Sequence, residues 1–189
     1  MMSIRRDSRF QAVHRFERWG ARQLLIGGIS AGAHLAVSTL VHLRDRRASA
    51  LGQIVGAHLD CGVYDLSGTP SARAADDRTL VVTRMWLDGL RDVGLPGFSL
   101  EECRRPELSP VFATLAGLPP AFFVVGALDP LLDDSLFLAS RWLAAGNRVS
   151  IEVWPEAAHA FTNMSTPLAG HALEHTTTWI SEILNDSLT

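Results

Sequence analysis

The chain has 189 residues, of which 47% are hydrophobic and 20% charged, and its formal net charge is −3. This composition is typical of a globular domain and not of a disordered chain, and the length suffices for one hydrophobic core but is short for two. Basic residues occur only in short groups such as Arg104-Arg105, so nucleic-acid binding is not expected. Arg5 and Arg6 precede Asp7 instead of an apolar core, and no apolar run approaches the roughly 20 residues of a membrane span. The sequence therefore predicts a cytoplasmic protein without a signal peptide or membrane span.

Hydrophobic patterns along the chain predict an alternation of strands and helices. A first helix is expected over residues 8–19, where apolar side chains recur at about helical spacing and Gly20 can end it. Short apolar runs followed by turn residues then predict strands at 24–28, 53–59, 121–125 and 149–154. The segments after these runs predict helices at 31–44, 79–92, 134–145 and 168–185. This alternation predicts an α/β fold, in which a parallel sheet of four strands carries helices on both faces through right-handed crossovers.

The segment Gly28-Ile29-Ser30-Ala31-Gly32 joins the first predicted strand to the helix after it. A G-x-S-x-G segment in this context is typical of a nucleophile elbow, a tight turn that presents the serine hydroxyl at the top of a sheet. We expect both glycines to be needed, because a side chain at either position would collide with the neighbouring strand or helix. The first N–H groups of the helix would point to where negative charge develops. The same letters also fit an ordinary strand–loop–helix joint.

Asp129 and His159 follow two other predicted strands. Asp129 lies in Gly126-Ala127-Leu128-Asp129-Pro130, and His159 lies shortly after the strand at 149–154. In a parallel sheet, sites form in the crevice outside the carboxyl ends of the strands. Ser30, Asp129 and His159 are therefore expected to meet there as nucleophile, acid and base, in the chain order Ser, Asp, His.

Other carboxylates and histidines compete for these roles. Asp133 and Asp134 are near enough to Asp129 to reach a neighbouring turn, although Asp133 is expected to cap the next helix. Among the histidines, His58 lies near a strand end that faces the site and is a candidate pocket residue, whereas His34 is expected to pack or bond locally. The others are expected to be solvated on helices: His14, His42, His171 and His175.

No metal site is expected. His171-Ala172-Leu173-Glu174-His175 spells H-x-x-E-H, and two histidines one helical turn apart can hold zinc, but a third ligand is needed and only 14 residues follow. An amphipathic helix gives the same letters by chance. Cys61 and Cys103 lack metal-ligand spacing and are expected to be free thiols.

Three stretches resemble the hormone-sensitive-lipase-like branch of the α/β-hydrolases, the fold-3 esterases. They are GISAGAHLA, ELSPVFATLAGLPPAFFVVGALDPLLDDS and LAAGNRVSIEVWPEAAHAF, and the resemblance runs from about Arg22 to the C-terminus. It implies an α/β-hydrolase fold, a small-molecule ester substrate with a short or medium acyl chain, and no metal or organic cofactor. It also implies that Ser30 is the nucleophile, Asp129 the acid and His159 the base, with the N–H of Ala31 in the oxyanion hole. Residues 66–110 lie where the family inserts a cap.

The chain departs from the family's pattern in two ways. Mild departures are Ile29 for an acidic residue, Ala33 for a glycine, and Ala160 in place of the glycine of H-G-F. The larger one is that the family's His-Gly-Gly loop, which supplies further oxyanion donors, has no counterpart among the 29 residues before Ser30. The chain therefore resembles the C-terminal part of a fold-3 hydrolase, a single truncated domain over 1–189, and slow turnover is expected.

Truncation also predicts an open sheet edge at the strand 24–28, because the strands that flank it in the family are absent. Either a second copy of the chain covers it, making a homo-oligomer, or the helix 8–19 folds over it, or the chain is poorly soluble. Alternative readings of the sequence are a start upstream of Met1, an inactive homologue that acts as a binding or assembly module, and an arylformamidase-like amide hydrolase. The last is compatible with Gly62-Val63-Tyr64-Asp65-Leu66.

Overall fold

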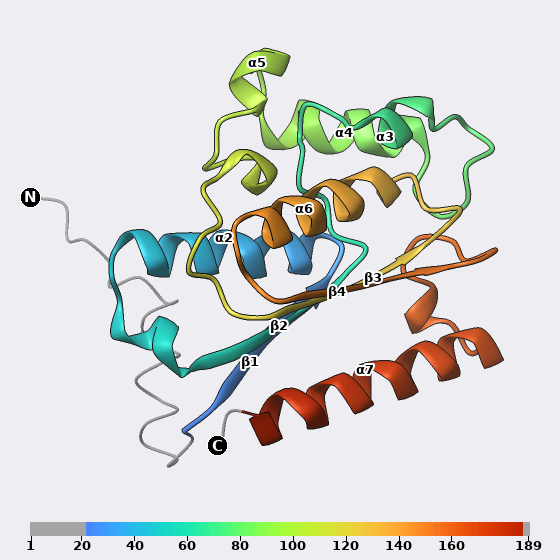
Figure 1. The fold of residues 1–189 in the computed structure, drawn as a ribbon. Coiled ribbons are helices and arrows are strands. Elements are labelled where there is room, and N and C mark those ends of the chain that lie inside the picture. Colours follow the sequence, from blue (N-terminus) through green and yellow to red (C-terminus); the bar gives the residue numbers. More distant parts are fainter. Residues whose placement is uncertain (1–21, 187–189) are drawn as a thin grey trace, which may run out of the picture.

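A four-stranded parallel sheet forms the centre of the protein, as predicted. The computed structural model describes residues 22–186, so the helix expected over 8–19 and His14 lie outside the described residues. The strands are β1 (Leu24–Ile29), β2 (Ile54–Asp60), β3 (Ala121–Gly126) and β4 (Val149–Trp154), hydrogen-bonded in that order. All three pairings are parallel, so the carboxyl ends of the strands share one edge of the sheet (Figure 1). Within the described residues β1 has a strand neighbour on one side only.

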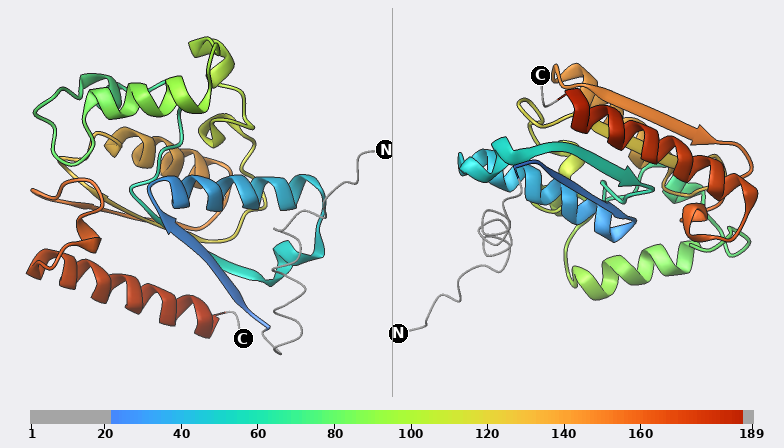
Figure 2. Two further views of the ribbon diagram at one scale, coloured as in Figure 1. Left: turned by 180° about the vertical axis from the view of Figure 1, so that it is seen from behind. Right: turned by 90° about the horizontal axis from the view of Figure 1, so that it is seen from below.

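Helices cover both faces of the sheet, which confirms the α/β prediction. Helices α2 (Ala31–Asp45) and α6 (Leu132–Ala144) lie on one face, and α7 (Pro167–Asp186) lies on the other (Figures 1 and 2). The continuous apolar run of β3 follows from this arrangement, because side chains that alternate between the faces all need burial. Phe123 packs in the cluster with α2 and α6, whereas Phe122 packs in the cluster with α7, its ring stacked on Trp179 at 5.5 Å between centroids. No helix in the described part of the chain is long and apolar enough to cross a membrane.

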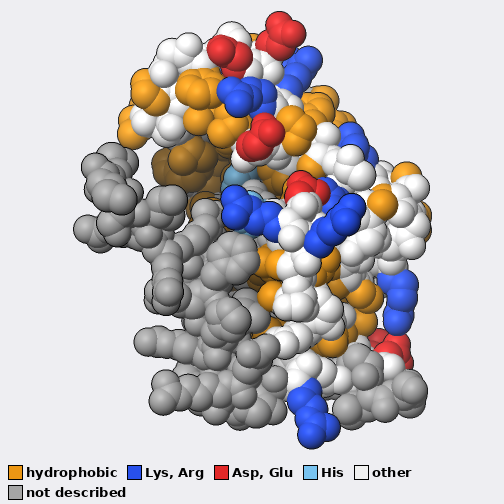
Figure 3. All heavy atoms as spheres, turned by 90° about the vertical axis from the view of Figure 1, so that its left-hand side faces the viewer, with side chains coloured by type: hydrophobic (Ala, Val, Ile, Leu, Met, Phe, Trp, Pro, Cys, Tyr) orange, Lys and Arg blue, Asp and Glu red, His pale blue; other side chains and the backbone are white. Residues whose placement is uncertain are grey.

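The segment between β2 and β3 forms a further layer over α6 (Figure 1). It contains α3 (Pro70–Ala74), α4 (Arg84–Gly94) and α5 (Leu100–Cys103), and its role as a cap stays a prediction. Short 3₁₀ turns complete the fold, namely η1 (Ser49–Gln53), η2 (Pro110–Phe112) and η3 (Phe161–Asn163). Apolar side chains of this layer reach solvent, and Figure 3 shows hydrophobic side chains gathered at its upper end; on α4 the exposed ones include Met85, Trp86 and Val93.

Two predicted boundaries in this layer are wrong. The helix expected from residue 79 begins only at Arg84, because a turn occupies 76–79 and the Thr83 hydroxyl accepts a hydrogen bond from Trp86 N as the helix cap. The segment 93–110, for which the sequence predicts no helix, contains α5. That helix begins with a capping box in which Ser99 N donates to Glu102 Oε2 at 2.8 Å and Glu102 N donates to Ser99 Oγ at 3.2 Å.

Candidate active site

Ser30 stands on a strained turn between β1 and α2. Its φ of 55° and ψ of −118° lie in a region that costs a non-glycine residue about 1–3 kcal/mol. Hydrogen bonds on both sides fix this conformation: Ser30 N donates to Asp60 O at 2.9 Å, and Ser30 O accepts from the amides of Ala33 and His34. The strand, turn and helix that the G-x-S-x-G segment predicts are therefore present.

The two glycines of this turn have different roles. A β-carbon on Gly28 would overlap the carbonyl group of Gly32 and lie 2.8 Å from Ala33 N, so this position needs glycine. A β-carbon on Gly32 would have no described atom within 4 Å. The expectation that a side chain would collide at both positions is therefore wrong for Gly32. The backbone of Gly32 packs against Gly28, but a side chain on Gly32 would point into open space.

His159 and Asp129 form a buried pair. Nδ1 of His159 lies 2.9 Å from Oδ2 and 3.1 Å from Oδ1 of Asp129, and the two residues are 4% and 3% exposed. Asp129 is held by its own turn, in which its amide donates to Gly126 O at 3.2 Å and its Oδ1 accepts from Leu131 N at 2.8 Å. The loop that carries His159 lies directly over β3, since a β-carbon on Gly126 would overlap Ala157 O. The pair can therefore fix one orientation and one tautomer of the imidazole.

The rival carboxylates lie elsewhere. Asp133 Oδ2 accepts from Ser71 N at 2.8 Å, so it tethers α3. The expectation that it caps α6 is wrong, because the N-terminus of α6 has no side-chain cap. Asp134 Oδ1 accepts from the amides of Tyr64 and Asp65 at 2.6 and 2.8 Å, and burial, which outweighs these hydrogen bonds, raises the pKa of Asp134 to about 7.

Three other described histidines have partners elsewhere in the fold. The Nε2 of His58 lies 3.3 Å from Thr176 Oγ1 under α7, and burial lowers its pKa; its role as a pocket residue stays a prediction. His34 Nδ1 is 2.8 Å from Val63 O, which ties α2 to the loop after β2. His175 is exposed and pairs with Glu152, its Nδ1 2.8 Å from Oε1.

Sequence reasoning missed two residues beside this pair, Asp60 and Cys61. Both are buried at the end of β2, and Cys61 Sγ lies within 4.8 Å of ligand atoms of Asp129 and His159. Asp60 Oδ2 accepts a short hydrogen bond from Thr162 Oγ1. Burial raises the pKa of Asp60, and the nearby Asp129 carboxylate adds to that rise. The rule that strand ends share one edge applied to β2 as well and would have found both residues.

Ser30 lies at the same edge as this pair, with β2 between the strands that carry Ser30 and Asp129. Among the described residues its Oγ has no hydrogen-bond partner. Ala31 is the first residue of α2, so its N–H is used by no turn of that helix. Catalytic hydrogen bonds in unliganded enzymes are often long and tighten only when substrate binds.

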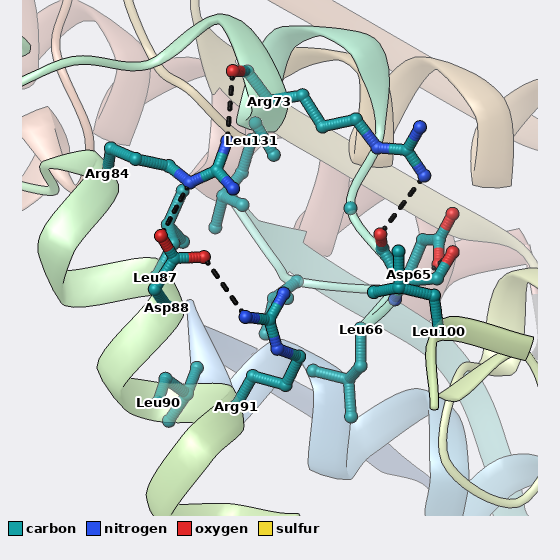
Figure 4. Close-up of a pocket in the computed structure, with 14 residues that line it drawn as sticks. Asp65, Leu66, Arg73, Arg84, Leu87, Asp88, Leu90, Arg91, Leu100 and Leu131 are labelled. Carbon is teal, nitrogen blue, oxygen red and sulfur yellow. Dashed lines mark hydrogen bonds and ion pairs between the residues drawn. The ribbon is translucent and has the colours of Figure 1, made fainter. Parts of the chain in front are cut away.

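A cavity of about 270 Å³ is lined by residues of α4 and of the loops that follow β2 and β3 (Figure 4). Val63 and Leu131, which line it, are two residues beyond Cys61 and Asp129, but neither Asp129 nor His159 is part of its wall. Arg84 and Arg91 extend from α4 and both form ion pairs with Asp88. Arg84 Nε lies 2.8 Å from Asp88 Oδ2, and Arg91 Nη2 lies 3.3 Å from Asp88 Oδ1 (Figure 4). The remaining wall combines apolar side chains with polar ones; the apolar ones include Leu66, Leu87, Leu90 and Leu100, and the polar ones are Asp65, Ser67 and Arg73.

Known proteins of two kinds resemble the chain. An acetyl-hydrolase of Streptomyces hygroscopicus is 32% identical over 143 residues, which are 74% of this chain and 45% of that protein. The hormone-sensitive lipase of Homo sapiens is 36% identical over 74 residues, which are 38% of this chain and 7% of the lipase. Among solved structures, an esterase of Pyrobaculum calidifontis superposes with a TM-score of 0.82 at 22% identity, covering 94% of this chain and 59% of the esterase.

A hormone-sensitive lipase from a metagenome library superposes with a TM-score of 0.80 at 26% identity, covering 89% of this chain and 56% of the lipase. The chain thus spans less than two thirds of the length of each of these relatives. The model of the α/β hydrolase fold family matches residues 10–163. The chain therefore belongs to the α/β-hydrolase fold family and is of the hormone-sensitive-lipase-like kind.

Proposed function

We propose that this protein hydrolyses small-molecule carboxylic esters with short or medium acyl chains, through Ser30, His159 and Asp129. The observation that carries the proposal is the buried pair in which His159 Nδ1 lies 2.9 Å from Asp129 Oδ2, at the sheet edge where the elbow presents Ser30. The names of the similar proteins, an acetyl-hydrolase and esterases, support the same reaction.

In this mechanism His159 is the base. Because Nδ1 faces the Asp129 carboxylate, the ring proton stays there and Nε2 keeps a lone pair for the Ser30 hydroxyl. Ser30 Oγ attacks the ester carbonyl as His159 takes its proton. Asp129 stabilises the imidazolium that forms, and because it is buried it does so without competition from water.

The negative charge on the carbonyl oxygen develops beside the start of α2. The N–H of Ala31 is the donor that this chain offers there, and one such donor is worth about 3–4 kcal/mol of transition-state stabilisation. Collapse of the tetrahedral intermediate transfers the proton from His159 to the leaving alcohol and leaves an acyl group on Ser30. Water then attacks the acyl-enzyme with the same base.

The cavity lined by α4 would receive the apolar part of the ester. The leucines in its wall suit an alkyl group, and its volume of about 270 Å³ matches a small one. This assignment gives the layer of α3, α4 and α5 the role of a cap.

The test is hydrolysis of a series of p-nitrophenyl esters from acetate to decanoate by the purified full chain, together with labelling by a fluorophosphonate probe that reacts with activated serines. Ser30→Ala should lose both labelling and at least about 10⁴-fold in rate. Ser140→Ala is the matched control, because that hydroxyl bonds only Leu136 O on the exposed face of α6. A Ser30→Ala variant that still hydrolyses the esters would refute the proposal.

The same assay separates the alternatives. An inactive homologue takes no probe and hydrolyses no ester, whereas an amide hydrolase takes the probe and prefers an aryl formamide. The sheet-edge homo-oligomer and the cytoplasmic location stay predictions.

A further inference from the structure

Three side chains of metal-ligating types, one of them the proposed base, meet beyond the ends of β2, β3 and β4. Cys61 Sγ, a carboxylate oxygen of Asp129 and a ring nitrogen of His159 all lie within 4.8 Å of one another. A tetrahedral zinc ion with bonds of about 2.0–2.3 Å holds its ligand atoms about 3.5 Å apart. Side-chain shifts of about 1 Å would therefore close these three atoms around one cation.

The charges around this cluster also favour a cation. Asp60, next to Cys61, adds a second buried carboxylate whose Oδ1 has no hydrogen-bond partner among the described residues. The ends of β2, β3 and β4 thus bring together two carboxylates, a thiol and a single imidazole.

The donor set selects the kind of metal. Magnesium and calcium prefer oxygen ligands only, whereas one thiolate, one imidazole and one carboxylate suit zinc. We propose that Cys61, Asp129 and His159 form an inhibitory binding site for a thiophilic divalent cation, with Zn²⁺ as its probe. Binding breaks the S–H bond of Cys61, forms an S–Zn bond and releases the thiol proton to the buffer, without a change of oxidation state.

Zinc at this site would remove the base of the proposed hydrolysis, and in this respect the inference rests on the proposed function. If zinc binds Nε2 of His159, it occupies the lone pair that the Ser30 hydroxyl needs. If it binds Nδ1, the ring proton moves to Nε2 and the lone pair is lost there as well. Either arrangement blocks ester hydrolysis.

The binding test does not depend on activity. Metal-free full chain is titrated with Co²⁺, whose thiolate complexes absorb in the near ultraviolet, and Zn²⁺ is then added to displace it and to compete with a chromogenic chelator. The wild type should give a thiolate band and bind one zinc ion in competition with cobalt. Cys61→Ser should lose the band and about 100-fold or more in zinc affinity, since even outer partners of metal ligands are worth about 10–100-fold.

Cys103→Ser is the matched control, because Cys103 is also a buried free thiol but belongs to no such cluster of described residues. It should keep both the band and the affinity. Exposed His171 and His175 can bind metal with nitrogen alone and give no thiolate band. Cys61→Ala replaces Cys61→Ser if the latter does not fold, as judged by circular dichroism.

Inhibition is measured as the ratio of rates with and without zinc, so that each variant is compared with itself. The rate with zinc should be at most about one tenth of the rate without zinc in the wild type and in Cys103→Ser. In Cys61→Ser the two rates should be nearly equal. A wild type without the thiolate band, or a Cys61 variant that keeps it, overturns the inference, as does hydrolysis that saturating zinc leaves unchanged. A thiolate band in a chain that hydrolyses no ester instead supports the metal site and refutes the proposed function.

Discussion

Gly28 and Gly32 meet backbone to backbone at the turn that carries Ser30, where a β-carbon on Gly28 would overlap the Gly32 carbonyl group and lie 2.8 Å from Ala33 N. Both β1 and the start of α2 are fixed by other contacts, so neither can move away. The two glycines of the same pentapeptide are therefore expected to respond differently to alanine.

Gly28→Ala should lower the free energy of unfolding by about 3 kcal/mol or more, because the new methyl group meets backbone that cannot rotate aside. Gly32→Ala should raise it by about 0.5–1 kcal/mol, since an open helical position gains helix propensity. Urea unfolding of both variants measures the difference. Equal costs at the two positions would contradict the packing described for this turn.

Asp134 should make stability depend on pH. Its folded pKa of about 7 lies above the value of 3.8 expected when unfolded, so the native state holds a proton between these pH values that the unfolded state has lost. The free energy of unfolding should therefore fall as pH rises from about 4 to 7, by an amount on the order of a few kcal/mol, and then level off.

Asp134→Asn should remove this contribution. Its amide oxygen can accept from Tyr64 N and Asp65 N as the carboxylate does, and its NH₂ can donate to Thr69 Oγ1. Urea unfolding at pH 5, 6, 7 and 8 should give a flatter profile for the variant than for the wild type. Parallel profiles would show that the carboxyl group keeps one protonation state throughout this range.

A comparison of Trp142 with Trp179 measures how much a buried hydrogen bond contributes to the free energy of unfolding. Trp142 is fully buried and its Nε1 donates to Pro119 O at 3.0 Å, whereas Trp179 stacks on Phe122 and its indole N–H has no partner among the described residues. Trp142→Phe should cost about 1–2 kcal/mol more than Trp179→Phe, because it also leaves the Pro119 carbonyl unpaired. If urea unfolding shows equal losses of unfolding free energy for the two variants, the hydrogen bond to Pro119 O does not contribute to stability.

The strands could be predicted because apolar runs followed by turn residues indicate buried strands. Phe122, Phe123 and Val124 form a continuous apolar run since consecutive side chains face different helix layers, and turn residues follow it. The shared carboxyl edge then brought Asp129 and His159 together in prediction as they are in the structure. That Ser30 completes their site as the nucleophile stays a prediction.

Other features depend on contacts that local patterns do not encode. His58 contacts Thr176 of α7, and the local sequence of its strand does not predict which residues of α7 pack against it. Helix α5 has only four residues, so its formation depends on the capping box at Ser99 and not on periodicity. Cys61 follows a strand, so the strand-end rule could have placed it at the shared edge, but how near its thiol comes to His159 depends on how β2, β3 and β4 pack.

Asp129 and Asp133 test the proposed mechanism most directly, because they differ by four positions and only one touches His159. Asp129→Asn should lower kcat about 10⁴-fold with little change in KM, since an amide can donate to Nδ1 and so move the ring proton to Nε2, where it blocks the Ser30 hydroxyl. Asp133→Asn should keep the wild-type rate, because its side-chain oxygen can still accept from Ser71 N. Steady-state hydrolysis of a p-nitrophenyl ester by both variants decides the assignment. A large loss in Asp133→Asn, with Asp129→Asn unaffected, would move the acid to the other residue and break the link between the buried pair and the reaction.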